Sequence, residues 1–210
     1  MKRLRMRIAL AIIGLAIGFI FGCGLPKPPA HPAPGVWYVL WSAGADPEMQ
    51  LDVPYAIPGD GGYVAYVQTA QSGAGTPSAM ALTFTVTGAA NLTAAIPDKY
   101  SISDFDPPAL RLFIELPGDN FTEPTKRYWC GDSKVNLTSD GEFAISCPLT
   151  FDHWADVNGV PELNQGFFDV NVLGRMQYAG FTFGGQNYAG HGVGCKKEPC
   201  TFTLDSWRFQ

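Results

Sequence analysis

The chain has 210 residues, with 14 basic and 19 acidic side chains and a formal net charge of −5. This length suits a single domain of ordinary size. An acidic chain without a basic patch argues against binding to nucleic acid, because such binding relies on lysines and arginines that contact phosphates. The same charge argues against electrostatic docking on anionic lipid.

The N-terminus has the layout of an export signal. Its first residues include four cations, Lys2, Arg3, Arg5 and Arg7. An uncharged apolar run at 8–21 follows, and its length of about 14 residues is short of the ~20 that span a bilayer as a helix. A charged start and a short apolar core are typical of a signal peptide. Removal of residues 1–22 takes away four of the 14 basic residues, which leaves 10 against 19 acidic ones and a net charge of −9.

The end of this segment, Ile20-Phe21-Gly22-Cys23, resembles the lipobox of bacterial lipoprotein signal peptides. Ile20 and Gly22 fit that pattern, whereas Phe21 stands where a small residue is usual. The resemblance implies that Cys23 carries acyl chains such as palmitate, becomes the first mature residue and attaches the protein to a lipid bilayer. Gly24, in place of an aspartate, implies sorting to the outer membrane if the host is a diderm bacterium. The alternative is an ordinary secretory signal that is cleaved nearby.

A proline-rich segment follows the cysteine. Residues 24–35 contain five prolines and two glycines, and such segments form extended, semi-rigid spacers. We therefore expect a signal peptide at 1–22, a lipidated cysteine with a tether at 23–36, and a single globular domain at 37–210.

Cysteine number agrees with this layout. Five cysteines are present, and an odd thiol in an exported protein needs an explanation. If Cys23 is acylated, the four that remain are Cys130, Cys147, Cys195 and Cys200. Export places them where disulfides persist. Four cysteines allow three connectivities, and proximity in the sequence favours Cys130–Cys147 with Cys195–Cys200.

From residue 37 onward, short alternating runs separated by turn residues predict a β-sandwich or barrel. The runs rich in Val, Ile, Phe, Tyr and Thr are 63–68, 81–88, 110–116, 142–147, 167–173, 179–183 and 201–207. Helix is expected only for a turn or two near 153–157. A hairpin is predicted about Asp140-Gly141, within the run 135–146. That hairpin does not place Cys130 opposite Cys147, so we expect a diagonal or loop-to-strand bridge.

Two of these runs have a defined inner face. In 81–88, Leu82, Phe84 and Val86 are predicted to face the core, with the threonines between them facing water. In 110–116 the same alternation places three aliphatic residues inward, Leu110, Leu112 and Ile114. It leaves a charged and aromatic face composed of Arg111, Phe113 and Glu115.

The glycine-rich stretch 183–195 connects the last two predicted strands. It has no Lys-Ser/Thr after its glycines and no following helix, which argues against phosphate binding. Its glycines are expected to adopt positive φ or to allow close backbone approach. The predicted Cys195–Cys200 bridge would close the far end of the loop. His191 is the residue of this loop considered for contact with a ligand.

Residues for catalysis or metal binding are few. The domain has two histidines, His153 and His191, and no Gly-x-Ser-x-Gly elbow. We expect each histidine to form local hydrogen bonds, with no metal and no cofactor bound, although loop oxygens at 57–62 and 117–120 could hold a structural calcium ion. The chain is not expected to be an enzyme. A sandwich-type glycoside hydrolase with paired carboxylates is kept as an alternative.

Sugar binding needs aromatic rings and planar polar groups. The best candidate surface is the Arg111/Phe113/Glu115 face with the neighbouring segment 126–130, and the candidate ligand residues are Arg111, Phe113, Glu115, Trp129 and His191. The segments 110–120, 126–130 and 202–209, with the glycine-rich loop between them, make residues 37–210 similar to galactose-binding-like jelly-roll domains. That resemblance implies an all-β jelly-roll sandwich of two antiparallel sheets, a fold found in carbohydrate-binding modules.

The sequence therefore predicts an envelope lipoprotein whose β-sandwich binds a ligand without catalysis, with a glycan as the expected ligand. Its expected partners are the lipid bilayer through Cys23 and a polysaccharide. The alternative is a structural lipoprotein that holds an envelope protein through one face of a sheet.

Overall fold

A computed structural model describes residues 35–40, 48–49, 53–60, 62–71, 77–94, 107–119, 123–185, 190–197 and 199–210. The predicted signal peptide, Cys23 and nearly all of the tether lie outside the described residues, so their predictions stand as they were made. His31–Gln210 form one compact unit. No described helix is long and apolar enough to cross a membrane.

Within the described residues, the larger sheet has seven antiparallel strands in the order β10-β8-β7-β11-β4-β1-β2. In chain order these are β1 (Trp37–Leu40), β2 (Glu48–Met49), β4 (Tyr66–Ala70), β7 (Pro108–Glu115), β8 (Arg127–Asn136), β10 (Trp154–Asp156) and β11 (Tyr178–Gly185).

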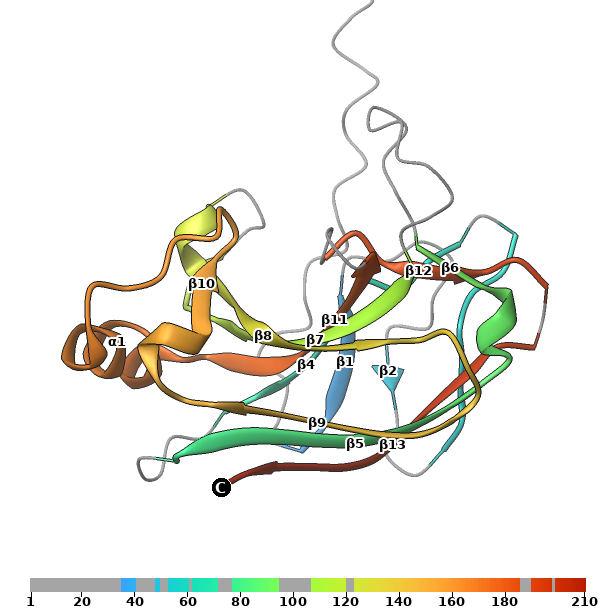
Figure 1. Ribbon diagram of the computed structural model, residues 1–210, viewed down its shortest axis with the longest axis horizontal. Helices are drawn as coiled ribbons and strands as arrows, with labels where there is room; N and C mark the ends of the chain where they lie inside the picture. Colours follow the sequence, from blue (N-terminus) through green and yellow to red (C-terminus); the bar gives the residue numbers. More distant parts are fainter. Residues whose placement is uncertain are drawn as a thin grey trace, which may run out of the picture. The chain divides into compact units, whose positions relative to one another are not determined.

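The smaller sheet has four described strands in the order β3-β13-β5-β9, also antiparallel. These are β3 (Tyr55–Ala56), β5 (Ala79–Thr87), β9 (Gly141–Pro148) and β13 (Thr201–Phe209). A separate two-stranded ladder pairs β6 (Leu92–Ala94) with β12 (Val193–Cys195). Figure 1 shows β5, β9 and β13 as one layer and β4, β7, β8 and β11 as the other.

The two sheets pack face to face around one hydrophobic core. Phe181 of β11 stacks on Phe202 of β13 with ring centroids 5.1 Å apart, and Trp37 of β1 meets the edge of Trp207 at 5.2 Å. All of these rings belong to or pack against a single cluster of buried residues drawn from both sheets. The predicted all-β sandwich of two antiparallel sheets is therefore confirmed.

The predicted alternation of β5 is confirmed as well. Leu82, Phe84 and Val86 are buried in the core. The threonines between them lie on the outer face, where Thr83 shares a hydrogen bond with Ser206 and Thr87 with Thr201, each at 2.6 Å. Such cross-strand hydroxyl pairs stabilise an exposed sheet face by a few tenths of a kcal/mol, up to about 1 kcal/mol, each.

The hairpin predicted about Asp140-Gly141 is wrong. β8 pairs with β7 and β10 in the larger sheet, whereas β9 pairs with β5 in the smaller one. The chain crosses between the sheets at 137–140, where Leu137 is fully buried and Asp140 accepts a hydrogen bond from the backbone N–H of Ala89. Burial of Leu137 and the fixed Asp140 side chain explain why this turn connects two layers rather than two neighbours.

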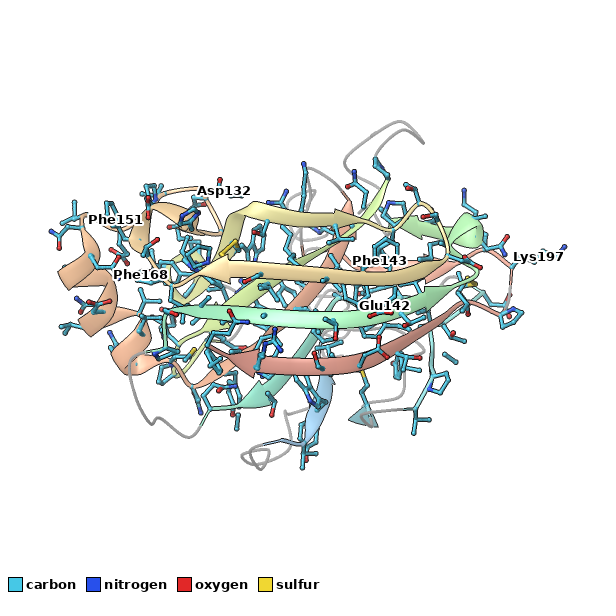
Figure 2. All side chains as sticks on the ribbon, turned by 60° about the horizontal axis from the view of Figure 1, so that its bottom comes forward. Asp132, Glu142, Phe143, Phe151, Phe168 and Lys197 are labelled. Carbon is cyan, nitrogen blue, oxygen red and sulfur yellow. A yellow bond between two sulfur atoms is a disulfide. The ribbon has the colours of Figure 1, made fainter. Side chains whose placement is uncertain are left out.

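The strand predicted at 167–173 is also wrong, because α1 (Gln165–Asn171) occupies this segment. Asn164 caps the helix by accepting a hydrogen bond from the N–H of Phe167 at 3.0 Å. Phe168 and Val172, four residues apart, are fully buried on one helical face. Figure 2 shows Phe168 and Phe151 at this end of the sandwich.

Helix was predicted near 153–157, and this prediction is also corrected. A single 3₁₀ turn covers Phe151–His153, and the next residues form strand β10 (Trp154–Asp156). β10 is held in place because Trp154, Ala155 and Asp156 pair with β8.

Candidate ligand-binding site

The outer face of the larger sheet, directed away from the smaller sheet, carries most of the residues that the sequence predicts for ligand binding. Leu110, Leu112 and Ile114 of β7 are buried in the main core, as predicted. The intervening residues therefore point to the opposite face. Phe113 joins Ala65 and Tyr66 there in a second buried cluster, against which Tyr63 and Trp129 pack.

Phe113 is buried in this face, where Tyr66 and Trp129 pack around it. Its side chain is 0% exposed, and the edge of its ring meets Tyr66 with centroids 5.2 Å apart. It also lies opposite Trp129 in the β7–β8 register. The prediction of Phe113 as a surface contact is therefore corrected, since a ring without exposed area cannot stack on a sugar. Its packing orients the two aromatic residues above it.

A buried ionic cluster lies at one end of the same face. Arg127 Nε lies 2.6 Å from Asp119 Oδ2, and its Nη1 donates a hydrogen bond to the Tyr66 hydroxyl at 3.1 Å. The Arg127 guanidinium also lies 5.7 Å from the centre of the Tyr66 ring. Both partners of the ion pair are almost wholly shielded from water. Burial raises the pKa of the Tyr66 phenol, although Arg127 opposes this effect.

Glu115 adjoins this cluster and lies opposite Arg127 in the sheet register. Only 5% of its surface is exposed. Burial, followed by the negative charge of Asp119, raises the pKa of Glu115 to about 8, although Arg127 and a hydrogen bond with Gln68 lower it. This carboxyl therefore holds its proton at neutral pH. Because Glu115 is covered, it can influence a ligand only through its neighbours, not as the surface contact predicted from sequence.

An open cavity of about 250 Å³ lies beside these groups. Its lining residues come from β7, β8, β10 and the turn after β10: Arg111, Trp129, Gly131, Ala155, Asp156, Val157, Asn158 and Gly159. Trp129 is half-buried, so part of its ring is accessible. Arg111 and Trp129 were predicted as ligand residues, and the structure brings both into the wall of one cavity.

The turn after β10 forms one side of the cavity. Asp156 Oδ1 accepts hydrogen bonds from the backbone N–H groups of Asn158 at 2.8 Å and Val160 at 2.9 Å. Gly159 adopts a φ of 78°, which a glycine accommodates without strain. The Asp156 carboxylate thus fixes the turn that presents Asn158.

An irregularity in β8 shapes the opposite side. Phe113 pairs with Trp129 and Arg111 pairs with Lys134, so four β8 residues, 130–133, lie opposite the single β7 residue Leu112. Insertions of this kind bend a strand and re-aim its side chains. Arg111 Nη1 donates to the carbonyl of Gly131 within this bulge at 3.4 Å. The bulge therefore helps to hold Arg111 at the cavity.

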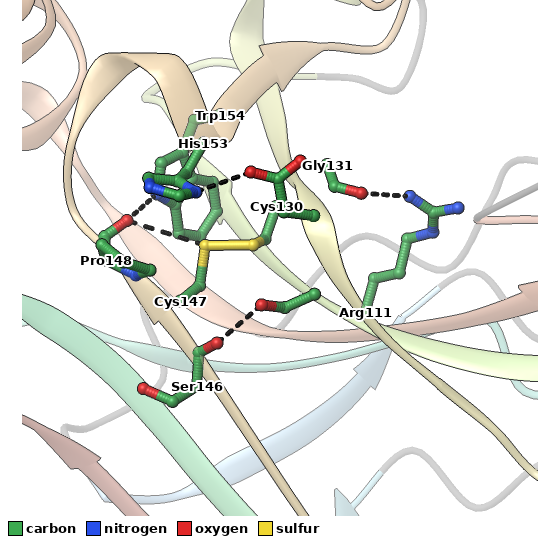
Figure 3. The surroundings of a disulfide bond; sticks show 10 residues. Arg111, Cys130, Gly131, Ser146, Cys147, Pro148, His153 and Trp154 are labelled. Atoms are coloured by element: carbon green, nitrogen blue, oxygen red, sulfur yellow. Dashed lines mark hydrogen bonds and ion pairs between the residues drawn. A yellow bond between two sulfur atoms is a disulfide. The ribbon is translucent and has the colours of Figure 1, made fainter.

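The same bulge carries a disulfide, shown in Figure 3. Cys130 of β8 is bonded to Cys147 of β9, with Cα atoms 6.3 Å apart. The connectivity Cys130–Cys147 and Cys195–Cys200 is confirmed. The expected diagonal or loop-to-strand geometry is wrong for the first pair, which joins strands of different sheets. Ser133 Oγ reinforces this junction by donating to the carbonyl of Ser146 at 2.6 Å.

His153 lies near this disulfide and forms the local contact that was predicted for it. Its Nδ1 lies 2.7 Å from Asp132 Oδ2 on the surface. The adjacent Trp154 is buried, and its indole N–H donates to the carbonyl of Pro148 at 2.7 Å. These contacts attach the start of β10 to the two disulfide-bearing strands (Figure 3).

The glycine-rich loop packs on the second cluster, and Gly190 and Gly192 have the positive φ predicted for its glycines. Gly190 has a φ of 81°, and a Cβ at this position would overlap the Tyr66 hydroxyl and approach Trp129 Cζ2 to 3.2 Å. Gly192 has a φ of 92°, and its Cβ would lie 2.7 Å from Tyr63 Cδ2. His191 stands between them and is half-buried. His191 does not line the cavity that holds Arg111 and Trp129.

Sequence reasoning missed several residues of this site. Tyr66 completes the buried cluster together with Arg127, which the sequence named only within the segment 126–130, and Asp156, Asn158 and Gly159 form the cavity turn. The Asn158-Gly159 pair is visible in the sequence as a turn, but the sequence holds no signal that β10 pairs with β8. Within the described residues, no group of three or more His, Cys, Asp or Glu side chains could hold a metal ion. In the segment 117–120, Asp119 lies 2.6 Å from Arg127.

No protein-family model, curated protein or solved structure matches the chain.

Proposed function

We propose that this protein is an exported, lipid-anchored β-sandwich that binds a glycan without catalysis. The observation that carries the proposal is the cavity of about 250 Å³ whose wall holds both Trp129, which is partly exposed, and Arg111. Sugars present apolar C–H faces to aromatic rings and hydroxyl groups to planar polar side chains. Asn158, on the fixed turn, adds an amide with both a donor and an acceptor.

The anchor rests on the sequence around Cys23. The two disulfides use four of the five cysteines, and Cys23 is the cysteine that takes part in neither. The disulfides also agree with export to an oxidising compartment. Mass spectrometry of the mature N-terminus tests this part directly. A diacylated terminus at Cys23 is expected, and an unmodified terminus, or one that begins elsewhere, would remove the anchor.

Non-catalytic binding is proposed because of where the carboxyl groups of this face lie. Glu115 and Asp119 interact electrostatically, but both are buried and neither lines the cavity. The carboxylate that does line it, Asp156, accepts two backbone hydrogen bonds through one oxygen. A glycosidase needs an acid and a second carboxylate on either side of the scissile bond.

A glycan array, followed by calorimetric titration with cell-wall and capsular polysaccharides, tests the binding function. Wild-type protein is expected to bind, and Trp129→Ala is expected to lose about tenfold or more in affinity. Val170→Ser is the matched control, since it removes an exposed apolar side chain from α1 rather than from the cavity. Folded wild-type protein that binds nothing in either assay would overturn the proposal.

A second candidate function has one specific observation in its favour. The segment from the cavity turn to α1 exposes several large apolar side chains: Val160, Leu163, Phe167 and Val170. Leu163 is 81% exposed and Val170 is 68% exposed. Exposed apolar patches mark sites of protein interaction, which supports the alternative of a lipoprotein that holds an envelope protein. The alternative would be favoured if Leu163→Ser and Val170→Ser weakened binding to an envelope protein in cells while Trp129→Ala left that binding unchanged.

A further inference from the structure

Two cations lie side by side next to the proposed glycan site. Arg111 of β7 and Lys134 of β8 are directly opposite one another in the sheet register and therefore project from the same face. Like charges in such a pair repel each other and destabilise the sheet. The mature chain has only 10 basic residues against 19 acidic ones, so a pair of adjacent cations is notable in its composition.

Two acidic side chains near the cavity have partners of their own. Asp156, in the cavity wall, is buried and accepts hydrogen bonds from two backbone N–H groups. Asp132, in the β8 bulge, pairs with His153. In the described part of the chain, Lys134 forms no ion pair. The structure thus places positive charge at the cavity without a carboxylate positioned to neutralise Lys134.

The cations adjoin the ring that would carry a sugar. Arg111 lines the cavity together with Trp129. Phe113, two residues after Arg111 on the same face of β7, lies opposite Trp129. One strip of the sheet therefore presents an accessible indole ring followed by a guanidinium and an ammonium group. A guanidinium recognises a carboxylate through paired hydrogen bonds, and an ammonium group adds a point charge.

We infer that the ligand of this site is an acidic glycan, in which a carboxylate-bearing sugar binds to Arg111 and Lys134 while a neighbouring ring stacks on Trp129. The inference rests on the proposed function, and it specifies the chemical class of the ligand. Binding of the anion offsets the repulsion between the two cations. Affinity is expected to fall as the salt concentration rises, because exposed charges are screened.

The test compares two probes that differ only at C6 of each sugar, which is a carboxylate in an oligogalacturonate and a neutral hydroxymethyl group in the oligogalactose of the same length and linkage. Wild-type protein is expected to bind the acidic chain about tenfold or more tightly. Arg111→Gln and Lys134→Gln should each reduce this preference, and the double variant should abolish it. Lys197→Gln is the matched control, since Lys197 is exposed, does not line the cavity and lies at the end of the sandwich opposite Phe168 (Figure 2). Circular dichroism of each variant establishes that it is folded.

The outcomes separate this inference from the proposed function. If both chains bind equally and Trp129→Ala abolishes both, glycan binding stands and the acidic specificity is overturned. A preference for the acidic chain that survives in the Arg111→Gln/Lys134→Gln variant likewise overturns the assignment of these two residues. If neither chain binds to folded wild-type protein and the glycan array is silent, the proposed function fails, and the inference fails with it.

Discussion

Cys130 and Cys147 form a covalent bond between the two sheets of the sandwich, because β8 belongs to the larger sheet and β9 to the smaller one. Both cysteines are fully buried. The bond sits at the bulge that also holds Arg111 through the carbonyl of Gly131. The crosslink therefore affects both the stability of the fold and the geometry of the cavity.

Removal of this bond as Cys130→Ala/Cys147→Ala is expected to lower the free energy of unfolding by about 3 kcal/mol, since the loop spans 17 residues. The Cys195–Cys200 bond closes a loop of only 5 residues, so Cys195→Ala/Cys200→Ala should cost about 2 kcal/mol. Urea unfolding of both variants measures the difference. A smaller loss for the first variant than for the second would contradict the role of Cys130–Cys147 as the main crosslink.

Glu115 makes stability depend on pH. Its pKa is raised from 4.5 in the unfolded chain to about 8 in the folded protein. The folded state therefore binds this proton more tightly. The resulting stabilisation is fully present below about pH 4.5 and is lost as the pH rises through about 8. Each unit of difference between the two pKa values corresponds to about 1.4 kcal/mol.

Glu115→Gln retains the shape of the protonated acid and removes its titration. The free energy of unfolding of this variant, measured by denaturant at several pH values, should fall less between about pH 5 and pH 8 than that of the wild type. Glu142→Gln, at an exposed position on β9, is the control and should retain the wild-type dependence. An identical pH profile for Glu115→Gln and wild type would show that Glu115 is not the group responsible.

Gly190 is expected to tolerate no side chain. Its φ of 81° is unfavourable for alanine, and the added Cβ would overlap the Tyr66 hydroxyl. Gly190→Ala should therefore destabilise the protein by about 1–3 kcal/mol. Gly35→Ala separates the two causes, because Gly35 has a similar φ of 83° with open space around it. Equal losses for the two variants in urea unfolding would mean that contact with Tyr66 does not matter.

Asn164 is the residue that starts α1. Its side chain accepts the hydrogen bond of the Phe167 N–H, which otherwise has no partner within the helix. Asn164→Ala should reduce the free energy of unfolding by about 1 kcal/mol, whereas Asn164→Asp or Asn164→Ser should retain most of it. Thermal unfolding of the three variants measures this order. Equal destabilisation by all three would show that the cap contributes nothing.

The sequence predicted those elements whose pattern is local. The alternation of Leu82, Phe84 and Val86, and of Leu110, Leu112 and Ile114, identified two strands and the face that each one buries. Close spacing identified both disulfides. These features depend on a period of two residues or on short loop closure, so they can be read along the chain.

The errors arose where long-range contacts decided the structure. The segment 167–173 is rich in residues that favour strands, but the Asn164 cap and the burial of Phe168 and Val172 make it helical. The turn at 140–141 has the residues of a hairpin, yet Leu137 is drawn into the core and the chain changes sheets. The cavity depends on the pairing of β10 with β8, and no residue pattern in the sequence predicts that pairing. Arg111 and Trp129 could be proposed, but the cavity between them could not.

The position of β13 constrains how the protein reaches its folded state. This strand follows all the others in the chain, yet it lies between β3 and β5 in the smaller sheet. Until residues 201–209 arrive, β5 has an unpaired edge along which another chain could add. During synthesis the N-terminal strands emerge first, so β5 is formed before its partner β13 is available. The sandwich therefore closes late, and a chain stopped before Thr201 is expected to aggregate rather than to form a smaller stable fold.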